Sequence, residues 1–173
     1  MKRLLTVFLC AAALASAQGP TRAPGFCLSD TNAQWRDLQD YRGKVVVIEF
    51  MQTTCPHCLE FTKVLSGVVS KYGDKVQVLS VALPNDTMPG LIQFVKGHKL
   101  AWPHLFDMGQ MAFSYLRQPN ISFPTVFLID RNGMIVNRWE YGALTKSVFE
   151  GEQLSREIDK LITPAAPAAP KKK

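Results

Sequence analysis

Two cysteines separated by two residues are the side chains of this sequence most able to do chemistry, in the segment Cys55-Pro56-His57-Cys58. The segment follows an apolar run over 45–50 and precedes apolar positions at helical spacing over 59–69. The first cysteine is therefore expected at a strand-to-helix junction, where the free N–H groups of a helix N-terminus favour a thiolate. A CXXC motif in this setting predicts a redox-active pair that forms and breaks a disulfide.

Disulfide exchange needs one thiolate that attacks and a second thiol that resolves the mixed disulfide. His57 lies between the two cysteines and offers a positive partner and a hydrogen-bond donor to a thiolate. Stabilising a thiolate stabilises the reduced protein, so a Pro-His pair favours a more oxidising disulfide. The alternative is a static structural disulfide, but so short a loop stabilises a fold poorly.

The start of the chain has the pattern of a secretory signal peptide over 1–17. Lys2 and Arg3 precede an apolar stretch over 4–14, and the small residues of 15–17 form a cleavage site. The stretch is too short to span a bilayer. Without this leader and the three terminal lysines, acidic and basic residues nearly balance, which argues against a nucleic-acid partner.

Export would place the remaining cysteines in an oxidising compartment. Cys10 lies inside the leader, and Leu9 before it is too large for a lipid-attachment signal. Cys27 lies outside the CXXC pair, and it is expected to be a small buried apolar residue, with a third redox role as the alternative.

The 173 residues suffice for one domain with a core, and we expect it over 24–162. A flexible lead-in is expected over 18–23, and a disordered tail rich in Pro, Ala and Lys over 163–173. Patterning predicts strands at 45–50, 75–83 and 125–129, a hairpin partner at 134–141, and helices at 56–72, 87–97, 109–117 and 147–162. Residues 25–44 are expected to be irregular. The alternation predicts an α/β domain with a central mixed β-sheet flanked by helices.

Three segments resemble the thioredoxin-like TlpA/ResA family of exported thiol–disulfide proteins: the CXXC pair after a strand, Phe123-Pro124-Thr125 before a strand, and residues 127–133. The resemblance covers about 24–162 and implies a thioredoxin-like fold. Thr54 stands where this family usually has a tryptophan. The Pro-His pair instead resembles that of DsbA-type oxidases.

The resemblance also implies roles for the site residues. Cys55 would attack and Cys58 would resolve, with Glu49, six residues before Cys55, as the base for Cys58. The alternative for Glu49 is a carboxylate at a strand end that reaches water. Pro124 would be a cis-proline facing the cysteines.

The resemblance also implies that the Phe123 backbone, together with Pro124 and Pro56, binds an extended substrate segment. His98 and His104 are expected to be surface or packing residues, and Trp102 and Trp139 to be core residues.

The expected function is an exported thiol:disulfide oxidoreductase that acts on protein thiols without cofactor or metal. It would be a periplasmic monomer with a membrane redox partner. A glycosylation-type triplet at 120–122 lies beside Pro124, where a glycan would obstruct substrate, which favours a bacterial periplasm.

Two other functions remain as alternatives. A copper-binding or copper-delivery protein is one, because thiolates select Cu(I). A thiol peroxidase is the other, but it needs a threonine and a proline where this chain has Gln52 and Ile48.

Overall fold

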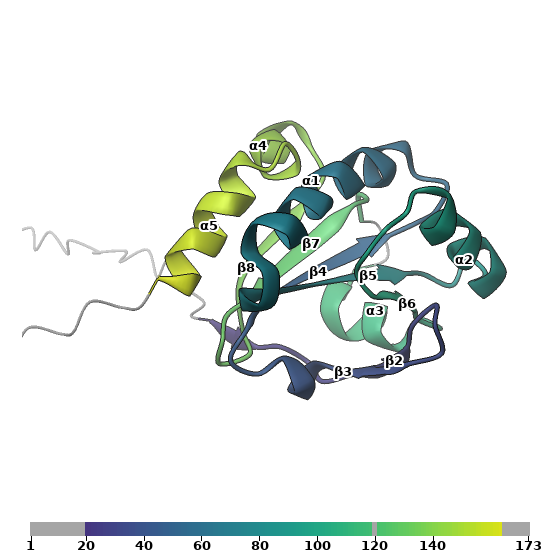
Figure 1. Cartoon of the computed structure of the whole chain (residues 1–173), viewed down its shortest axis with the longest axis horizontal. Helices are drawn as coiled ribbons and strands as arrows, with labels where there is room; N and C mark the ends of the chain where they lie inside the picture. Colours follow the sequence, from purple (N-terminus) through teal and green to yellow (C-terminus); the bar gives the residue numbers. More distant parts are fainter. Residues whose placement is uncertain (1–19, 119–120, 164–173) are drawn as a thin grey trace, which may run out of the picture.

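A six-stranded mixed sheet forms the centre of the computed structural model, which describes residues 20–118 and 121–163 (Figure 1). The strand order is β1-β8-β7-β4-β5-β6. The strands are β1 Thr21–Arg22, β4 Val45–Met51, β5 Val76–Ala82, β6 His104–Phe106, β7 Thr125–Ile129 and β8 Met134–Glu140. The predicted signal peptide, residues 18–19 of the lead-in and residues 164–173 of the tail lie outside the described residues.

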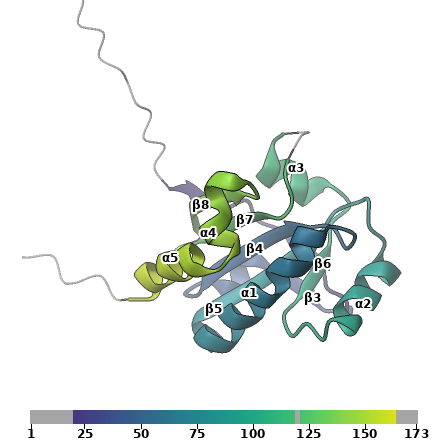
Figure 2. The ribbon, with the colours of Figure 1, turned by 90° about the horizontal axis from the view of Figure 1, so that it is seen from above.

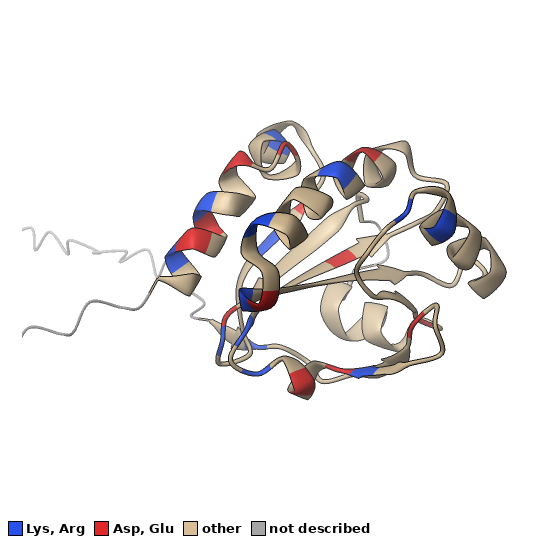
Figure 3. Cartoon of the chain, viewed as in Figure 1, with Lys and Arg blue, Asp and Glu red and all other residues tan. Residues whose placement is uncertain are grey.

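Strand β4 is central and is buried along its whole length. It pairs in parallel with β5 and antiparallel with β7, so the sheet is mixed as expected. The register places Glu49 opposite Ser80 on one side and Val126 on the other. Figure 3 shows an acidic position in β4, which is Glu49, the one charged residue of that strand.

Helices cover both faces of the sheet. They are α1 Pro56–Tyr72, α2 Met88–Gly97, α3 Gln110–Leu116, α4 Lys146–Phe149 and α5 Glu152–Ile162. Figures 1 and 2 show α1 and α5 side by side on one face, while α3 lies on the other. No helix among the described residues is long and apolar enough to cross a bilayer.

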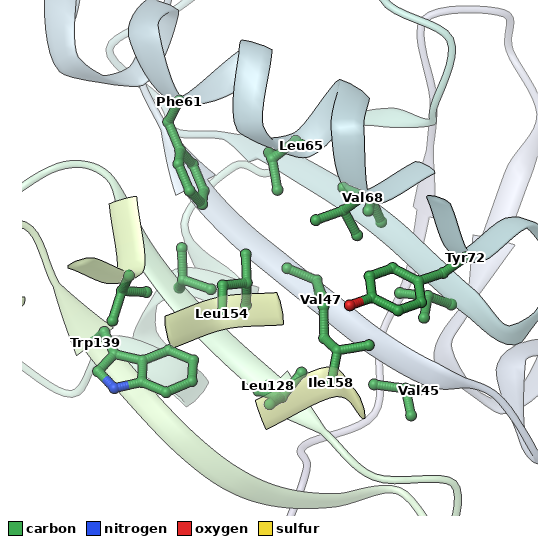
Figure 4. Packing of buried hydrophobic residues seen from close by; sticks show 14 of the residues in the cluster. Val45, Val47, Phe61, Leu65, Val68, Tyr72, Leu128, Trp139, Leu154 and Ile158 are labelled. Atoms are coloured by element: carbon green, nitrogen blue, oxygen red, sulfur yellow. The ribbon is translucent and has the colours of Figure 1, made fainter. Parts of the chain in front are cut away.

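Each face of the sheet has its own apolar core, because successive residues of a strand point to opposite sides. Val45 and Val47 pack with α1 and α5 through residues such as Leu65 and Leu154 (Figure 4). The intervening residues of β4, namely 46, 48 and 50, pack on the α3 side. The alternation therefore places Glu49 on the α1 face. Trp102 and Trp139 belong to that core, as expected.

Helix α1 has the predicted bounds because its ends carry clear signals. Pro56 occupies its first turn, where a missing N–H costs nothing, and Gly73 ends it with a φ of 52°. Thr87 caps α2 by accepting from the Gly90 N–H. The predicted last helix is divided into α4 and α5 at Gly151, whose φ is 93°.

Three expectations about the first part of the chain differ from the structure. Within the lead-in, Thr21 and Arg22 pair with β8 and Ala23 is buried. Residues expected to be irregular contain a two-stranded sheet, β2 Cys27–Ser29 and β3 Trp35–Asp37. Cys27 is exposed, not buried, because it begins β2 in this small sheet outside the main core.

Candidate active site

Cys55 lies at the junction of β4 and α1 and is the N-cap residue of the helix. Its backbone is extended, with φ −84° and ψ 116°, and its Sγ accepts a hydrogen bond from the Cys58 N–H at 3.2 Å. The side chain is half-buried, so one sulfur of the pair is accessible. The Cys58 N–H thus points at this sulfur from the first turn of α1, the end at which the helix dipole is positive.

Cys58 lies one helical turn further along and is fully buried, in contact with an apolar cluster that includes Met51 and Phe94. Burial raises the pKa of the Cys58 thiol strongly, and a hydrogen bond with Cys55 and the charge of Glu49 raise it further. Cys58 therefore holds its proton unless a base removes it.

Glu49 is fully buried beside this pair, on the face of the sheet that α1 covers. Burial raises its pKa from 4.5 to about 7, against a hydrogen bond from Ser80 that lowers it. The Ser80 hydroxyl donates to Oε2 at 2.6 Å, and Oε1 has no hydrogen-bond partner among the described residues. The alternative of a strand-end carboxylate reaching water is therefore wrong.

Pro124 and Phe123 are brought next to the cysteines by β7, which is paired with β4. The Phe123–Pro124 peptide bond is cis, as expected. The Phe123 carbonyl oxygen lies 3.7 Å from the Cys55 Sγ, and the Pro124 carbonyl accepts from the Tyr141 N–H at 3.0 Å. A groove runs beside this pair between Gln52 and Phe123.

His57 and Pro56 are both exposed. The His57 ring stacks on Tyr141, with centroids 4.1 Å apart and an interplanar angle of 18°. Its Nδ1 lies 3.5 Å from a carboxylate oxygen of Glu60. No hydrogen bond joins His57 to Cys55 in the described chain, so His57 can act on the thiolate through charge alone.

Asp86 positions the segment before Cys55, a role that the sequence did not indicate. Its buried carboxylate accepts hydrogen bonds from the Thr53 N–H at 3.1 Å and from the Thr53 hydroxyl. Asp86 thus ties the loop after β5 to the loop after β4. The visible signal was an acidic residue beside the α2 cap, which is equally typical of helix starts.

Trp102 is linked to Glu49 through Ser80, since Trp102 Nε1 donates to the Ser80 hydroxyl at 2.8 Å. Among the described residues, no group of three or more His, Cys, Asp or Glu side chains is arranged to hold a metal ion. The copper alternative thus has only the cysteine pair and His57 to draw on here, and His57 faces Glu60 and Tyr141.

Comparison with known proteins gives a consistent result. Residues 20–138 match the model of the AhpC/TSA family. The thiol-disulfide oxidoreductase ResA of a Bacillus cereus strain is 30% identical over 130 residues, which cover 75% of this chain and 73% of that protein. ResA of Geobacillus thermodenitrificans is 33% identical over 136 residues, covering 76% and 74%.

Among solved structures, this chain is similar to a Chlorobium tepidum protein described as a candidate thiol:disulfide interchange protein DsbE. The TM-score is 0.72 at 25% identity, over 83% of this chain and 97% of the other. The expected thioredoxin-like fold and the resemblance to ResA are confirmed.

Proposed function

Because this chain belongs to the AhpC/TSA family and is a thiol–disulfide oxidoreductase, we propose that it exchanges a Cys55–Cys58 disulfide with protein thiols. The observation that carries this proposal is the pairing of an accessible, helix-capping Cys55 with a fully buried Cys58 above a buried carboxylate. The first sulfur can meet a substrate, and the second can react only within the protein.

In the reducing direction, the Cys55 thiolate attacks one sulfur of a substrate disulfide. A Cys55–substrate disulfide forms, and the other substrate sulfur leaves as a thiolate and takes a proton from solvent. Cys58 then gives its proton to Glu49, directly or through one water, and its sulfur attacks the Cys55 Sγ. The Cys55–Cys58 disulfide forms, the remaining substrate sulfur leaves as a thiolate, and two electrons have passed to the substrate.

The oxidising direction retraces these steps. A substrate thiolate attacks the Cys55 Sγ, and Cys58 leaves as a thiolate and takes the proton held by Glu49. A second substrate thiolate then attacks the substrate sulfur of the mixed disulfide and releases Cys55. A pKa of about 7 suits Glu49 to both directions, because a group that titrates near the working pH can give or take a proton.

The substrate is proposed to be an extended polypeptide segment that lies along residues 123 and 124. The Phe123 carbonyl is next to the Cys55 sulfur, so a strand paired with that backbone would bring its own cysteine to Cys55. Pro56 follows Cys55 in the chain, is exposed, and would contact the same segment.

The leader pattern of residues 1–17 supports export, and we place the protein in the periplasm as a monomer that exchanges electrons with a membrane redox partner. Cell fractionation and N-terminal sequencing test the export step. A periplasmic chain that begins at residue 18 is expected, and an uncut cytoplasmic chain would contradict it.

Trapping of mixed disulfides tests the cysteine roles. Cys58→Ser should accumulate protein joined to its substrates through Cys55, whereas Cys55→Ser should not. Cys27→Ser is the matched control, because it removes an exposed cysteine outside the pair and should exchange disulfides like the unchanged protein. Trapping by Cys55→Ser instead would reverse the assignment.

A further inference from the structure

A chain of three side chains crosses the sheet beneath the cysteines, from β4 to the segment before β6. Trp102 Nε1 donates to the Ser80 hydroxyl at 2.8 Å, and the Ser80 hydroxyl donates to Glu49 Oε2 at 2.6 Å. All three residues are buried, with Glu49 and Ser80 fully so. The parallel register of β4 and β5 places Glu49 and Ser80 opposite each other.

The direction of these hydrogen bonds follows from the groups themselves. An indole N–H can only donate, so the Ser80 oxygen accepts from Trp102. The hydroxyl has a single proton, and Glu49 Oε2 is the one acceptor that it reaches among the described residues, so this proton is directed to Glu49. Oε2 of Glu49 is then an acceptor in every protonation state, and any proton on this carboxyl resides on Oε1. Oε1 is the atom that has no hydrogen-bond partner among the described residues.

We propose that Ser80 and Trp102 are positioning residues that hold Glu49 by Oε2 and so reserve Oε1 for exchanging a proton with Cys58. This inference rests on the proposed role of Glu49 as base and adds the atom that carries the proton. An unheld carboxyl could rotate and present either oxygen, so the two residues fix the direction of proton transfer.

His104 completes the arrangement without adding charge. Its Nδ1 donates to the Trp102 carbonyl at 2.8 Å, and its ring lies against the Trp102 indole, 5.1 Å between centroids. Burial lowers the pKa of His104 to about 4, so the ring is neutral at neutral pH. It thereby helps to hold Trp102 in place.

The groups that face Glu49 are few. Cys58 faces it from α1, Ser80 from β5 and the apolar Val126 from β7, with neutral His104 one strand beyond Ser80. Ser80 is therefore the group that stabilises the charged form of the carboxyl, and its removal should leave the carboxyl protonated to higher pH.

The pH dependence of the resolution step tests this inference. All proteins in this experiment carry Cys27→Ser, which removes the exposed thiol outside the pair, and this background serves as the unchanged protein. The reduced protein is mixed with excess 5,5′-dithiobis(2-nitrobenzoate), which releases one thiolate when Cys55 attacks and a second when Cys58 resolves the mixed disulfide. In the unchanged protein the second rate should rise through a midpoint near the Glu49 pKa. Ser80→Ala should move this midpoint upward by about one pH unit, since a hydrogen bond to a charged group is lost.

Trp102→Phe retains the ring but removes the N–H, so it should move the midpoint upward by less. Ser80→Thr retains the hydroxyl and should restore the original midpoint. Thr62→Val is the matched control, because the buried Thr62 hydroxyl bonds only to the carbonyl of Leu59 in its own helix. Its midpoint should stay in place.

An unmoved or lowered midpoint in both Ser80→Ala and Trp102→Phe would overturn the inference. If Ser80→Ala does not fold, Trp102→Phe decides alone. Glu49→Gln separates the two claims: a profile that keeps its midpoint without Glu49 contradicts the base role itself. A midpoint that disappears in Glu49→Gln but stays in place in both Ser80→Ala and Trp102→Phe contradicts the positioning role only.

Discussion

Glu49 occupies a position where a carboxylate costs folding free energy at neutral pH. Its pKa is about 7 in the folded protein against 4.5 for an exposed glutamate, so the folded state keeps the proton to higher pH. Stability due to this group is therefore lost as the pH rises from about 4.5 to 7, and the penalty is complete above that range. The proposed role of Glu49 as base would account for a buried carboxyl that lowers the stability of the fold.

Glu49→Gln should remove this pH dependence, because the amide has no charge and can still accept from Ser80. The free energy of unfolding of the variant is compared with that of the unchanged reduced protein at each pH. From pH 4 to pH 8 this difference should change by up to about 3 kcal/mol in favour of the variant. Urea denaturation at a series of pH values measures the difference. A difference that does not change with pH would show that Glu49 titrates normally.

His57 should make the disulfide more oxidising through its charge near the helix N-terminus. His57→Pro, in the first turn where proline is tolerated, should shift the reduction potential in the negative direction. The shift should be tens of millivolts, at about 30 mV for each 1.4 kcal/mol. Equilibration with glutathione buffers measures it.

Glu60→Gln is the matched control for His57. It removes the carboxylate 3.5 Å from the imidazole, so the potential should move in the opposite direction. The shift should be smaller because Glu60 is largely exposed and screened by solvent. Equal potentials in all three proteins would remove His57 from the mechanism.

The cysteine pair was predictable from residue type and spacing, and Glu49 and Pro124 from the resemblance to the thioredoxin-like family. Ser80 and Trp102 were not, since their contact with Glu49 depends on the register of β4 and β5 and on a segment 22 residues away. A serine within an apolar strand is a weak signal until the strand opposite is known.

At the scale of elements, the loops at the ends of β4 and β5 are coupled by Asp86 and Thr53. Asp86→Ala should destabilise the protein by about 1–3 kcal/mol, because the partly buried Thr53 N–H loses its acceptor. It should also slow mixed-disulfide formation, since the loop that leads to Cys55 is no longer held. Urea denaturation and the first thiolate release measure the two effects.

Thr87→Ala is the control for this prediction. It removes the α2 cap next to Asp86 and should cost about 1 kcal/mol without slowing mixed-disulfide formation. An equal slowing by both variants would mean that α2, and not the loop contact, determines the position of Cys55.

The longer elements were predictable because each combines an apolar pattern with an end signal. The helix at 56–72 and the strand at 125–129 have the expected bounds. The short strands β1, β2 and β3 have only two or three residues each and no period of their own. They form because a partner is present, in the case of β1 the residues 134–135, far along the chain.

For the molecule as a whole, we expect α5 to be required for stability and residues 164–173 not to be. Removal of 164–173 should leave the free energy of unfolding unchanged, because those residues are Pro, Ala and Lys. Removal of 152–173 also deletes Leu154 and Ile158, both fully buried, and losses at such positions cost about 2–5 kcal/mol each. The longer deletion should abolish cooperative unfolding, as measured by circular dichroism in urea. Destabilisation by the shorter deletion would contradict this view.

Both ends of the described chain lie away from the cysteines (Figure 1). Strand β1 pairs with the start of β8, whereas Phe123 and Cys55 lie beyond the other end of the sheet, where Phe50 pairs with Thr125. Helix α5 lies beside the C-terminal end of α1, where Lys71 of α1 forms an ion pair with Asp159 of α5. The 17 residues of α1 therefore separate that end from Cys55 by about 25 Å. A protein immobilised on an electrode or a bead through residue 20 or 163 would present its reactive sulfur to the solution.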